Sequence, residues 1–365
     1  MRSPLPPNLA RASLSPGGNT GLWYDKFCNR WNEEWRLSSK SDENPKLQWI
    51  RTVTGEPVGR AALVAEASAR IADLTLARRG ALGVFVAASR FVTGLGRRHP
   101  VENGFAWHPT LGVPYLPGSS VKGLVRAWAE LDADPVAPKE RVEAIFGSQN
   151  SSGDVVFLDA LPVAPVRLEA DVMTPHYAGW SPPEPENLPG DWRSPTPVPF
   201  LAVAAGGAFA FSILPADTGG TPGLAEVFGW LKAALEVAGA GAKTSVGYGR
   251  FTLDEAKTAA LRTASEQRGE AERRADLERS PEGRWRLRLK GKKELEVLEA
   301  VRVHLEKARL EDPAERRGLS QAVAAGGFLD SWRKGKPLDR ATNFGAAKLK
   351  ERAKLVDAEL TEEKA

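Results

Sequence analysis

Cysteine and histidine are scarce in this chain of 365 residues, which contains one cysteine, Cys28, and four histidines. A single cysteine excludes an intrachain disulfide framework and fits a reducing compartment, so we expect a cytoplasmic protein. It also excludes cysteine-rich zinc sites, and no spacing of paired carboxylates or several histidines is typical of a metal centre. The sequence therefore predicts neither a metal nor another cofactor.

Long apolar runs and a strong net charge are also missing. No apolar run approaches the roughly 20 residues needed to cross a bilayer, and residues 1–20 lack the apolar segment of a secretory signal, so we expect no membrane association. The formal net charge is +4, which permits a nucleic-acid partner without requiring one, because the clustering of cations matters more than their sum. The hydrophobic content of 42% and charged content of 26% are typical of a globular protein with ample material for a core.

Residues 114–126, PYLPGSSVKGLVR, indicate a turn that opens a helix. Ser119 or Ser120 is predicted to cap this helix, because a serine oxygen accepts from an otherwise unpaired backbone N–H. Lys122 and Arg126 are four residues apart and share one face. Free amides, hydroxyls and two cations at a helix start suit a phosphate group. The alternative is an ordinary capped helix whose two cations are solvated.

Residues 239–251, GAGAKTSVGYGRF, form a second motif that is rich in glycine. Small side chains let the backbone of such a loop approach a ligand closely. It is not a P-loop, which requires a glycine directly before the lysine, where this chain has Ala242. The alternative is a tight helix-to-strand turn, and the tyrosine ring either stacks on a base or packs beneath the loop. The residues expected to bind are Gly241, Lys243, Thr244, Ser245, Gly247, Tyr248, Gly249 and Arg250.

The elements expected around these motifs alternate in a recognisable order. Strands are predicted at 81–92, 154–161, within 200–214 and at 250–253, and helices at 119–131, 139–146 and 222–238. The resulting β-α-β-β-α-β pattern is typical of an α+β, ferredoxin-like (RRM-like) fold. We expect three regions: an N-terminal Trp-rich segment and helix at 1–79, the core at 80–254, and a charged, mostly helical extension at 255–365.

A proline-rich insertion interrupts the predicted core at about residues 163–199, with eight prolines between 175 and 199. Prolines stiffen a projecting segment without suiting it to the interior of a sheet. The alternative is a long surface loop that packs on its own core. The side chains expected to project from the insertion are Met173, His176, Tyr177 and Trp180.

The two flanking regions carry simpler expectations. In the first, Phe27, Trp31 and Trp35 share a helical face and predict a short helix, followed by a helix at 57–79. In the extension, we expect a helix at 255–279, a short strand at 284–290 where apolar and cationic residues alternate, and further amphipathic helices. The extension either binds RNA, docks a neighbouring subunit or simply exposes solvated basic groups.

The two motifs in this order resemble those of the RAMP superfamily of CRISPR effector proteins. The helix start matches a GSSxKGxxR pattern at 118–126, and the glycine-rich loop matches the one near the end of the family's core. The segment HPVENGFAWHPTLGVPYLPG at 99–118 is similar in particular to the sixth subunits of type III-B (Cmr) complexes. The resemblance covers roughly residues 80–255.

The resemblance implies a RAMP ferredoxin-like core and a non-catalytic, RNA-binding role in antiviral defence. It implies a position toward the 3′ side of the guide RNA, capping a helical stack of backbone subunits. The insertion would then correspond to the thumb that wedges into the guide–target duplex. The implied partners are guide (CRISPR) RNA, target RNA and other Cmr subunits, especially the backbone RAMP subunit.

Catalysis is the remaining question from the sequence. His99, Glu102 and His108 precede the motif helix and are the residues able to act in metal-free RNA cleavage. The resemblance implies an aspartate in this loop of a cleaving relative, yet residues 94–118 contain none. We therefore expect no catalytic residues, and His99 and Glu102 are expected to hold the loop backbone. Two alternatives stay open: a metal-independent endoribonuclease that processes guide RNA, and a protein scaffold with little RNA contact.

Overall fold

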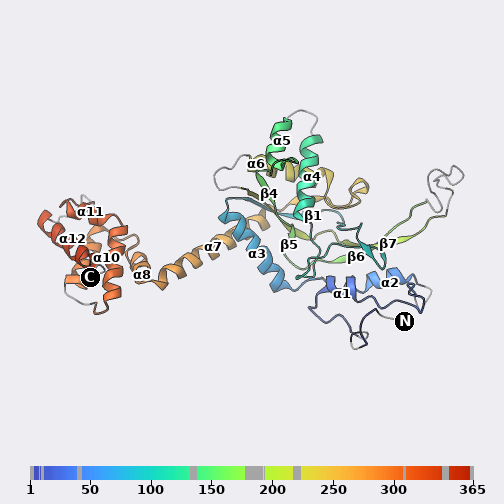
Figure 1. Ribbon diagram of the computed structural model, residues 1–365, viewed down its shortest axis with the longest axis horizontal. Helices are drawn as coiled ribbons and strands as arrows, with labels where there is room; N and C mark the ends of the chain where they lie inside the picture. Colours follow the sequence, from blue (N-terminus) through green and yellow to red (C-terminus); the bar gives the residue numbers. More distant parts are fainter. Residues whose placement is uncertain are drawn as a thin grey trace. The chain divides into compact units, whose positions relative to one another are not determined.

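The computed structural model describes residues 4–7, 9, 12–38, 43–131, 138–176, 192, 194–216, 223–306, 310–338 and 345–361. The chain divides into two compact units, residues 1–265 and 266–365. Strands and helices are mixed in the first unit, and the second is helical (Figure 1). The protein is therefore of the mixed α and β class that the sequence predicts.

The first unit is built on an antiparallel sheet. Its strands are β1 (Ala81–Ala87), β4 (Val155–Phe157), β5 (Leu161–Pro162), β8 (Ala208–Pro215) and β9 (Phe251–Leu253). They follow the order β4-β8-β1-β9, and β5 also pairs with β8. Phe85 in β1 lies opposite Phe209 in β8 on one side and Leu253 in β9 on the other. The sheet is thus assembled from strands far apart in the sequence.

Both faces of this sheet are covered, which explains why β1 and β8 are continuous apolar runs rather than alternating ones. Helix α3 (Ala61–Ala77) covers one face, where its Ala72 packs with Leu82 of β1. Phe85 points to the other face, and its ring centroid lies 6.1 Å from that of Phe228 in α6 (Leu224–Ala233). Alternate residues of one strand therefore contact different helices.

Helix α6 lies on the same side as α4 (Gly118–Leu131) and α5 (Lys139–Phe146) (Figure 1). It continues as a π-helical turn at Ala234–Ala238, which leads into the glycine-rich motif. The helix predicted at 139–146 is confirmed at both ends, and Gly147 follows it with a φ of 80°.

Two hairpins extend from the first unit's core. Strands β2 (Arg98–His99) and β3 (Glu102–Asn103) form a small hairpin before α4. Strands β6 (Leu168–Met173) and β7 (Val198–Val203) pair along their whole length and form the base of the proline-rich insertion. We use the name "insertion base" for β6 and β7. Residues 177–191 of the insertion lie outside the described residues.

The helix predicted around Phe27, Trp31 and Trp35 is wrong. The helices of this region are α1 (Thr20–Lys26) and α2 (Pro45–Arg51), whereas Trp31 forms an isolated bridge with Leu37. The Asn32 side chain accepts hydrogen bonds from two following backbone amides, at 3.1 and 2.8 Å, and so competes with a helix.

The second unit consists of the end of α7 (Glu255–Arg279) and the helices after it. These are α8 (Pro281–Leu289), α9 (Glu294–Val301), a π-helical turn (Arg302–Glu306), α10 (Pro313–Ala325), α11 (Phe328–Arg333) and α12 (Ala346–Thr361). They bury their own apolar core, which includes Trp285, Leu298, Leu319 and Val356.

The strand predicted at 284–290 is wrong, because this segment belongs to α8. Ser280 caps the helix by accepting from the Gly283 amide at 3.0 Å, and Pro281 occupies its first turn. The burial of Trp285 in the unit's core then favours the helix over a strand with one exposed cationic face.

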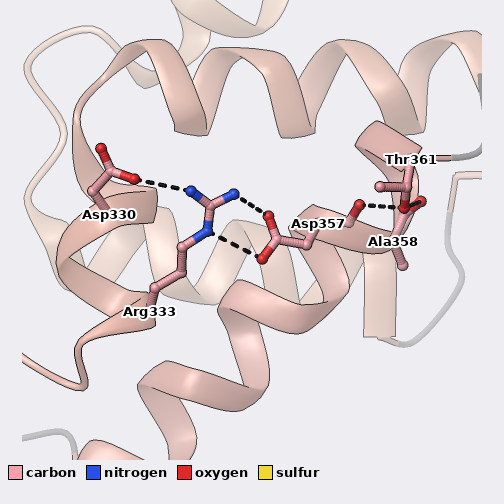
Figure 2. Close-up of polar contacts among 5 residues, drawn as sticks. All are labelled: Asp330, Arg333, Asp357, Ala358 and Thr361. Carbon is pink, nitrogen blue, oxygen red and sulfur yellow. Dashed lines mark hydrogen bonds and ion pairs between the residues drawn. The ribbon is translucent and has the colours of Figure 1, made fainter.

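Ion pairs and a hydrogen bond connect helices of the second unit. Arg333 of α11 reaches Asp330 at 2.9 Å and Asp357 of α12 at 2.5 Å (Figure 2). The indole N–H of Trp332 donates to the buried carboxylate of Glu294 at 2.7 Å. The exposed ion pairs contribute at most about 1 kcal/mol each, so the apolar core does most to stabilise this unit. No helix among the described residues of either unit is long and apolar enough to cross a membrane.

Candidate nucleic-acid interface

The glycine-rich motif is a loop whose backbone lies repeatedly in the left-handed region. Gly239, Gly241, Gly247 and Gly249 have φ values of 79°, 84°, 93° and 73°, and Lys243 has a φ of 61°. Glycine adopts these angles without a steric penalty, whereas other residues lose about 1 kcal/mol or more. The glycines therefore permit this loop conformation, and Lys243 is strained.

Two of these glycines are also required by close backbone contacts. A Cβ on Gly249 would lie 1.9 Å from the Ala240 carbonyl oxygen, and one on Gly241 would lie 2.1 Å from the Val92 carbonyl oxygen. A Cβ on Gly247, in contrast, would meet nothing within 4 Å. One side of the loop is thus packed on its own chain, while its tip at Gly247 is open.

The cations of the loop have no carboxylate partner among the residues that the structure describes. The Lys243 ammonium lies 5.3 Å above the Phe200 ring of β7. Arg250 donates weakly to the Thr244 carbonyl oxygen at 3.4 Å, while its Nη1 is buried without a hydrogen-bond partner there. Ser245 at the tip is exposed. A partly buried cation that lacks a counter-ion favours the arrival of an anion.

The ring of Tyr248 packs against Phe200 beneath the loop, which is one of its two predicted roles. Its ring centroid lies 6.0 Å from that of Phe200, and its hydroxyl donates to the Asp171 carboxylate of β6. Burial and the neighbouring Asp171 charge raise the pKa of the Tyr248 hydroxyl, so it remains protonated as a donor at neutral pH. The loop therefore rests on the insertion base.

Of the predicted insertion residues, the structure brings Met173 to the loop. Its sulfur is 3.9 Å from the Lys243 ammonium, and it belongs to the same apolar cluster as Tyr248. His176 follows β6 by three residues, and Tyr177 and Trp180 lie outside the described residues.

The predicted cap of the motif helix is wrong. Helix α4 begins at Gly118, and Ser119 and Ser120 are exposed residues of its first turn. The Gly118 amide instead donates to the carboxylate of Asp159 at 2.7 Å. The sequence carries no local signal for this contact, because Asp159 lies 41 residues downstream and is brought there by the bridge between Leu116 and Ala160.

The two cations of α4 differ in their surroundings. Lys122 has no ion-pair partner within the described part of the chain, whereas the Nε of Arg126 donates to Glu130 at 2.7 Å. Arg126 also approaches the Gly147 carbonyl oxygen at 3.5 Å. Lys122 is therefore available to an anion, while Arg126 would have to release a partner.

A single segment, residues 90–93, joins the two motifs. Its Arg90 and Val92 carbonyls accept from Gly249 at 2.7 Å and from Ala242 at 2.8 Å in the glycine-rich loop. The next residue, Thr93, forms hydrogen bonds with the segment that precedes α4. Its carbonyl oxygen accepts from the Ala106 amide at 2.9 Å, and its hydroxyl donates to the Tyr115 carbonyl oxygen at 3.0 Å. The two motifs, more than 110 residues apart in the sequence, are therefore both hydrogen-bonded to residues 90–93, which follow strand β1.

His99 is buried and both of its ring nitrogens are engaged. Its Nε2 donates to the Tyr24 carbonyl oxygen at 3.0 Å, and its Nδ1 accepts from the Val101 amide at 3.3 Å. Burial lowers the pKa of this imidazole to about 4, so it is neutral at physiological pH. Its ring stacks on Tyr24 at 4.4 Å. Without a free lone pair or a titratable proton near pH 7, His99 is suited to structure.

The other two candidates for catalysis, His108 and Glu102, each contact a neighbouring group, His108 through its Nδ1. His108 accepts at Nδ1 from the Leu111 amide at 3.3 Å, and burial lowers its pKa. Glu102 forms an ion pair with Lys46 of α2 and has a φ of 78° at the β2–β3 turn. Among the described residues, no group of three or more His, Cys, Asp or Glu side chains is placed to hold a metal ion.

Comparisons with known proteins agree with the two motifs. The family model described as the RAMP superfamily matches residues 84–252. The Cmr subunit Cmr6 of Pyrococcus furiosus is 30% identical, over 46% of this chain and 66% of its own length. Cmr6 of Saccharolobus solfataricus is 28% identical, over 50% of this chain and 57% of its own length. The chain thus spans less than two thirds of the length of each of these relatives.

Among solved structures, a Type III-B Cmr-beta complex bound to cognate target RNA contains a similar chain. The TM-score is 0.47 at 22% identity, with 64% of this chain and 79% of that chain covered. The crystal structure of Cmr6 from Pyrococcus furiosus has a TM-score of 0.33 at 29% identity, covering 48% of this chain and 97% of that one.

Proposed function

We propose that this chain, which matches the RAMP superfamily model over residues 84–252 and is similar to Cmr6 subunits, is an RNA-binding subunit of a type III-B CRISPR effector complex. Its proposed place is the 3′ side of the guide RNA, at the end of a stack of backbone RAMP subunits. Its proposed partners are guide RNA, target RNA and other Cmr subunits, within the cytoplasm.

The observation that carries the RNA-binding proposal is the set of cations without counter-ions at the glycine-rich loop. Lys243 and Arg250 have no carboxylate partner among the described residues, and the adjacent tip at Gly247 has room for a ligand. Lys122 on α4 adds a third such cation. Phosphate contacts of this kind position an RNA backbone without reading its sequence.

The sheet supports a ferredoxin-like interpretation of the core. Strand β1 lies between β8 and β9, all neighbours are antiparallel, and α4 and α6 are the two connecting helices. This arrangement suits a β-α-β-β-α-β chain. The insertion base then leaves the core between its second and third strands, as a thumb would.

We propose that the subunit is non-catalytic. Metal-free RNA cleavage needs a base with an available lone pair and an acid near the leaving oxygen. The ring nitrogens of His99 are both engaged, and Glu102 is paired with Lys46. These commitments support a role in holding the backbone before α4.

The test is binding of fluorescently labelled single-stranded RNA by the full chain over a range of salt concentrations. Replacing Lys243 with glutamine should weaken binding several-fold and reduce the log–log salt slope by about 0.7, the value for one phosphate contact on a single strand. The matched control is Lys232→Gln, which removes the same charge from the exposed surface of α6.

Equal effects of the Lys243 and Lys232 substitutions would show that the loop is not the interface. Ultraviolet crosslinking of the assembled complex distinguishes a scaffold, which would yield no crosslink to this chain. Cleavage of a repeat RNA by the purified chain without metal would favour the endoribonuclease.

A further inference from the structure

A polar network connects the insertion base to the glycine-rich loop. The Asp171 carboxylate of β6 accepts from the Tyr248 hydroxyl and, at 2.6 Å, from the Arg90 guanidinium. Arg90 also donates to Glu169 at 2.8 Å, and its carbonyl oxygen accepts from the Gly249 amide at 2.7 Å. One carboxylate of the insertion therefore contacts both the loop and the segment that anchors it.

The tip of the loop, residues 243–248, is weakly supported, whereas its two ends are joined by the Ala240 amide, which donates to the Gly249 carbonyl oxygen at 2.8 Å. At the tip, the amides of Val246, Gly247 and Tyr248 donate within the loop over 3.2, 3.1 and 3.3 Å, all longer than the most common N–H···O distance of about 2.9–3.0 Å. The glycines cost the most chain entropy on ordering, and Lys243 is held at a strained φ. A segment of this kind takes its conformation from contacts with its surroundings.

We propose that Asp171 is a positioning residue that holds the glycine-rich loop through Tyr248, so that the insertion base sets how tightly the loop binds RNA. This inference rests on the proposed function of the loop. When only a fraction of the molecules has the binding-competent loop conformation, the apparent affinity equals the intrinsic affinity multiplied by that fraction. The Asp171–Tyr248 bond would raise this fraction and so strengthen binding.

Glu169 is a built-in comparison for Asp171. Both carboxylates lie on β6 and both contact Arg90, but Asp171 alone of the two contacts Tyr248. Asp171 is also the more enclosed, with a side chain 19% exposed against 44% for Glu169. Asp171→Asn and Glu169→Gln remove the same charge two residues apart on one strand.

The sign of the effect separates positioning from direct electrostatics. Removing an acid near an RNA site reduces repulsion, so a purely electrostatic effect would leave both variants binding as well as or better than the parent protein. Positioning instead predicts that Asp171→Asn binds RNA about three- to tenfold more weakly, because a neutral amide oxygen is a weaker acceptor from Tyr248 than the carboxylate, while Glu169→Gln does not weaken binding.

The experiment compares the full chain with Asp171→Asn, Tyr248→Phe, the double variant and Glu169→Gln, using the same labelled RNA and salt series. We expect the double variant to be no weaker than Tyr248→Phe alone, because both changes act on the same hydrogen bond, which Tyr248→Phe already removes. The salt slope should stay at the parent's value in these variants, since the same phosphates are contacted once the loop is formed. Lys243→Gln, in contrast, should lower it.

Three outcomes would overturn the inference: unchanged affinity in both Asp171→Asn and Tyr248→Phe, strictly additive losses in the double variant, or an equal loss in Glu169→Gln. If Asp171→Asn fails to fold, judged by its melting temperature, Tyr248→Phe decides alone. RNA binding by the parent protein and by Lys243→Gln is measured in the same salt series. If these two bind equally, the proposed function fails, and if they differ while Tyr248→Phe matches the parent, only the positioning role fails.

Discussion

Acidification should destabilise the first unit through His99. In the folded chain its side chain is 3% exposed and its pKa is lowered to about 4 by burial. In the unfolded chain the imidazole titrates at its ordinary value, 6.5. Between these two values the unfolded state binds a proton that the folded state does not, so stability is complete above pH 6.5 and falls as the pH approaches 4.

The magnitude follows from the separation of the two pKa values. Each pH unit corresponds to 1.36 kcal/mol, so His99 contributes a loss of about 2 kcal/mol at pH 5 and about 3 kcal/mol once the pH reaches 4. The loss of stability is large because protonation would bury a charge. The imidazolium of His99 would lie against the Tyr24 ring, and its Nε2 is 3.8 Å from the nearest carboxylate, that of Asp25.

The assay is urea denaturation of the full chain at half-unit steps from pH 8 to pH 5, for the parent and His99→Gln. Glutamine retains a donor for the Tyr24 carbonyl oxygen, and the variant should be less stable than the parent at every pH. Its unfolding free energy should, however, fall by about 2 kcal/mol less than the parent's between pH 8 and pH 5. His108→Gln is the matched control and should keep most of the parent's slope. A His99→Gln variant with the parent's full pH dependence would refute the reasoning.

Three further outcomes follow from the site geometry. Gly249→Ala should destabilise the protein by about 2 kcal/mol or more because its Cβ meets a carbonyl oxygen at 1.9 Å, while Gly247→Ala should cost only about 1 kcal/mol for its positive φ, as thermal melts would show. Lys122→Gln should weaken RNA binding and lower the salt slope by about 0.7 without changing the melting temperature, and an unchanged slope would remove α4 from the interface. Asp159→Ala should cost about 1 kcal/mol by leaving the Gly118 amide unpaired, measurable by urea denaturation, and no loss would mean that water replaces the carboxylate.

Elements with strong local signals are predictable from this sequence. Helix α5 is confirmed at 139–146 because its apolar spacing, length and terminal Gly147 agree with one another. The glycine-rich loop is likewise recognisable, since four positive-φ positions are filled by the residue that tolerates them. The cations of the candidate interface were identified in the same way, and their contact with RNA stays a prediction.

Two predictions were wrong because a competing signal outweighed the apolar spacing. The alternation at 284–290 suggested a strand, but a Ser-Pro helix start and the burial of Trp285 produce α8. The aromatic spacing at 27–35 suggested a helix, but the side chain of Asn32 competes for backbone amides.

By itself, then, the sequence determined which segments are locally biased and which residues carry positive charge beside flexible backbone, because propensity and charge belong to single residues and their near neighbours. The tertiary structure alone decided the partners. Asp159 meets the amide of Gly118 across 41 residues, and Asp171 meets Tyr248 across 77, through pairing of β6 and β7 and the course of residues 90–93. These contacts depend on which strands pair, and no local pattern encodes the distance between two side chains that the fold brings together.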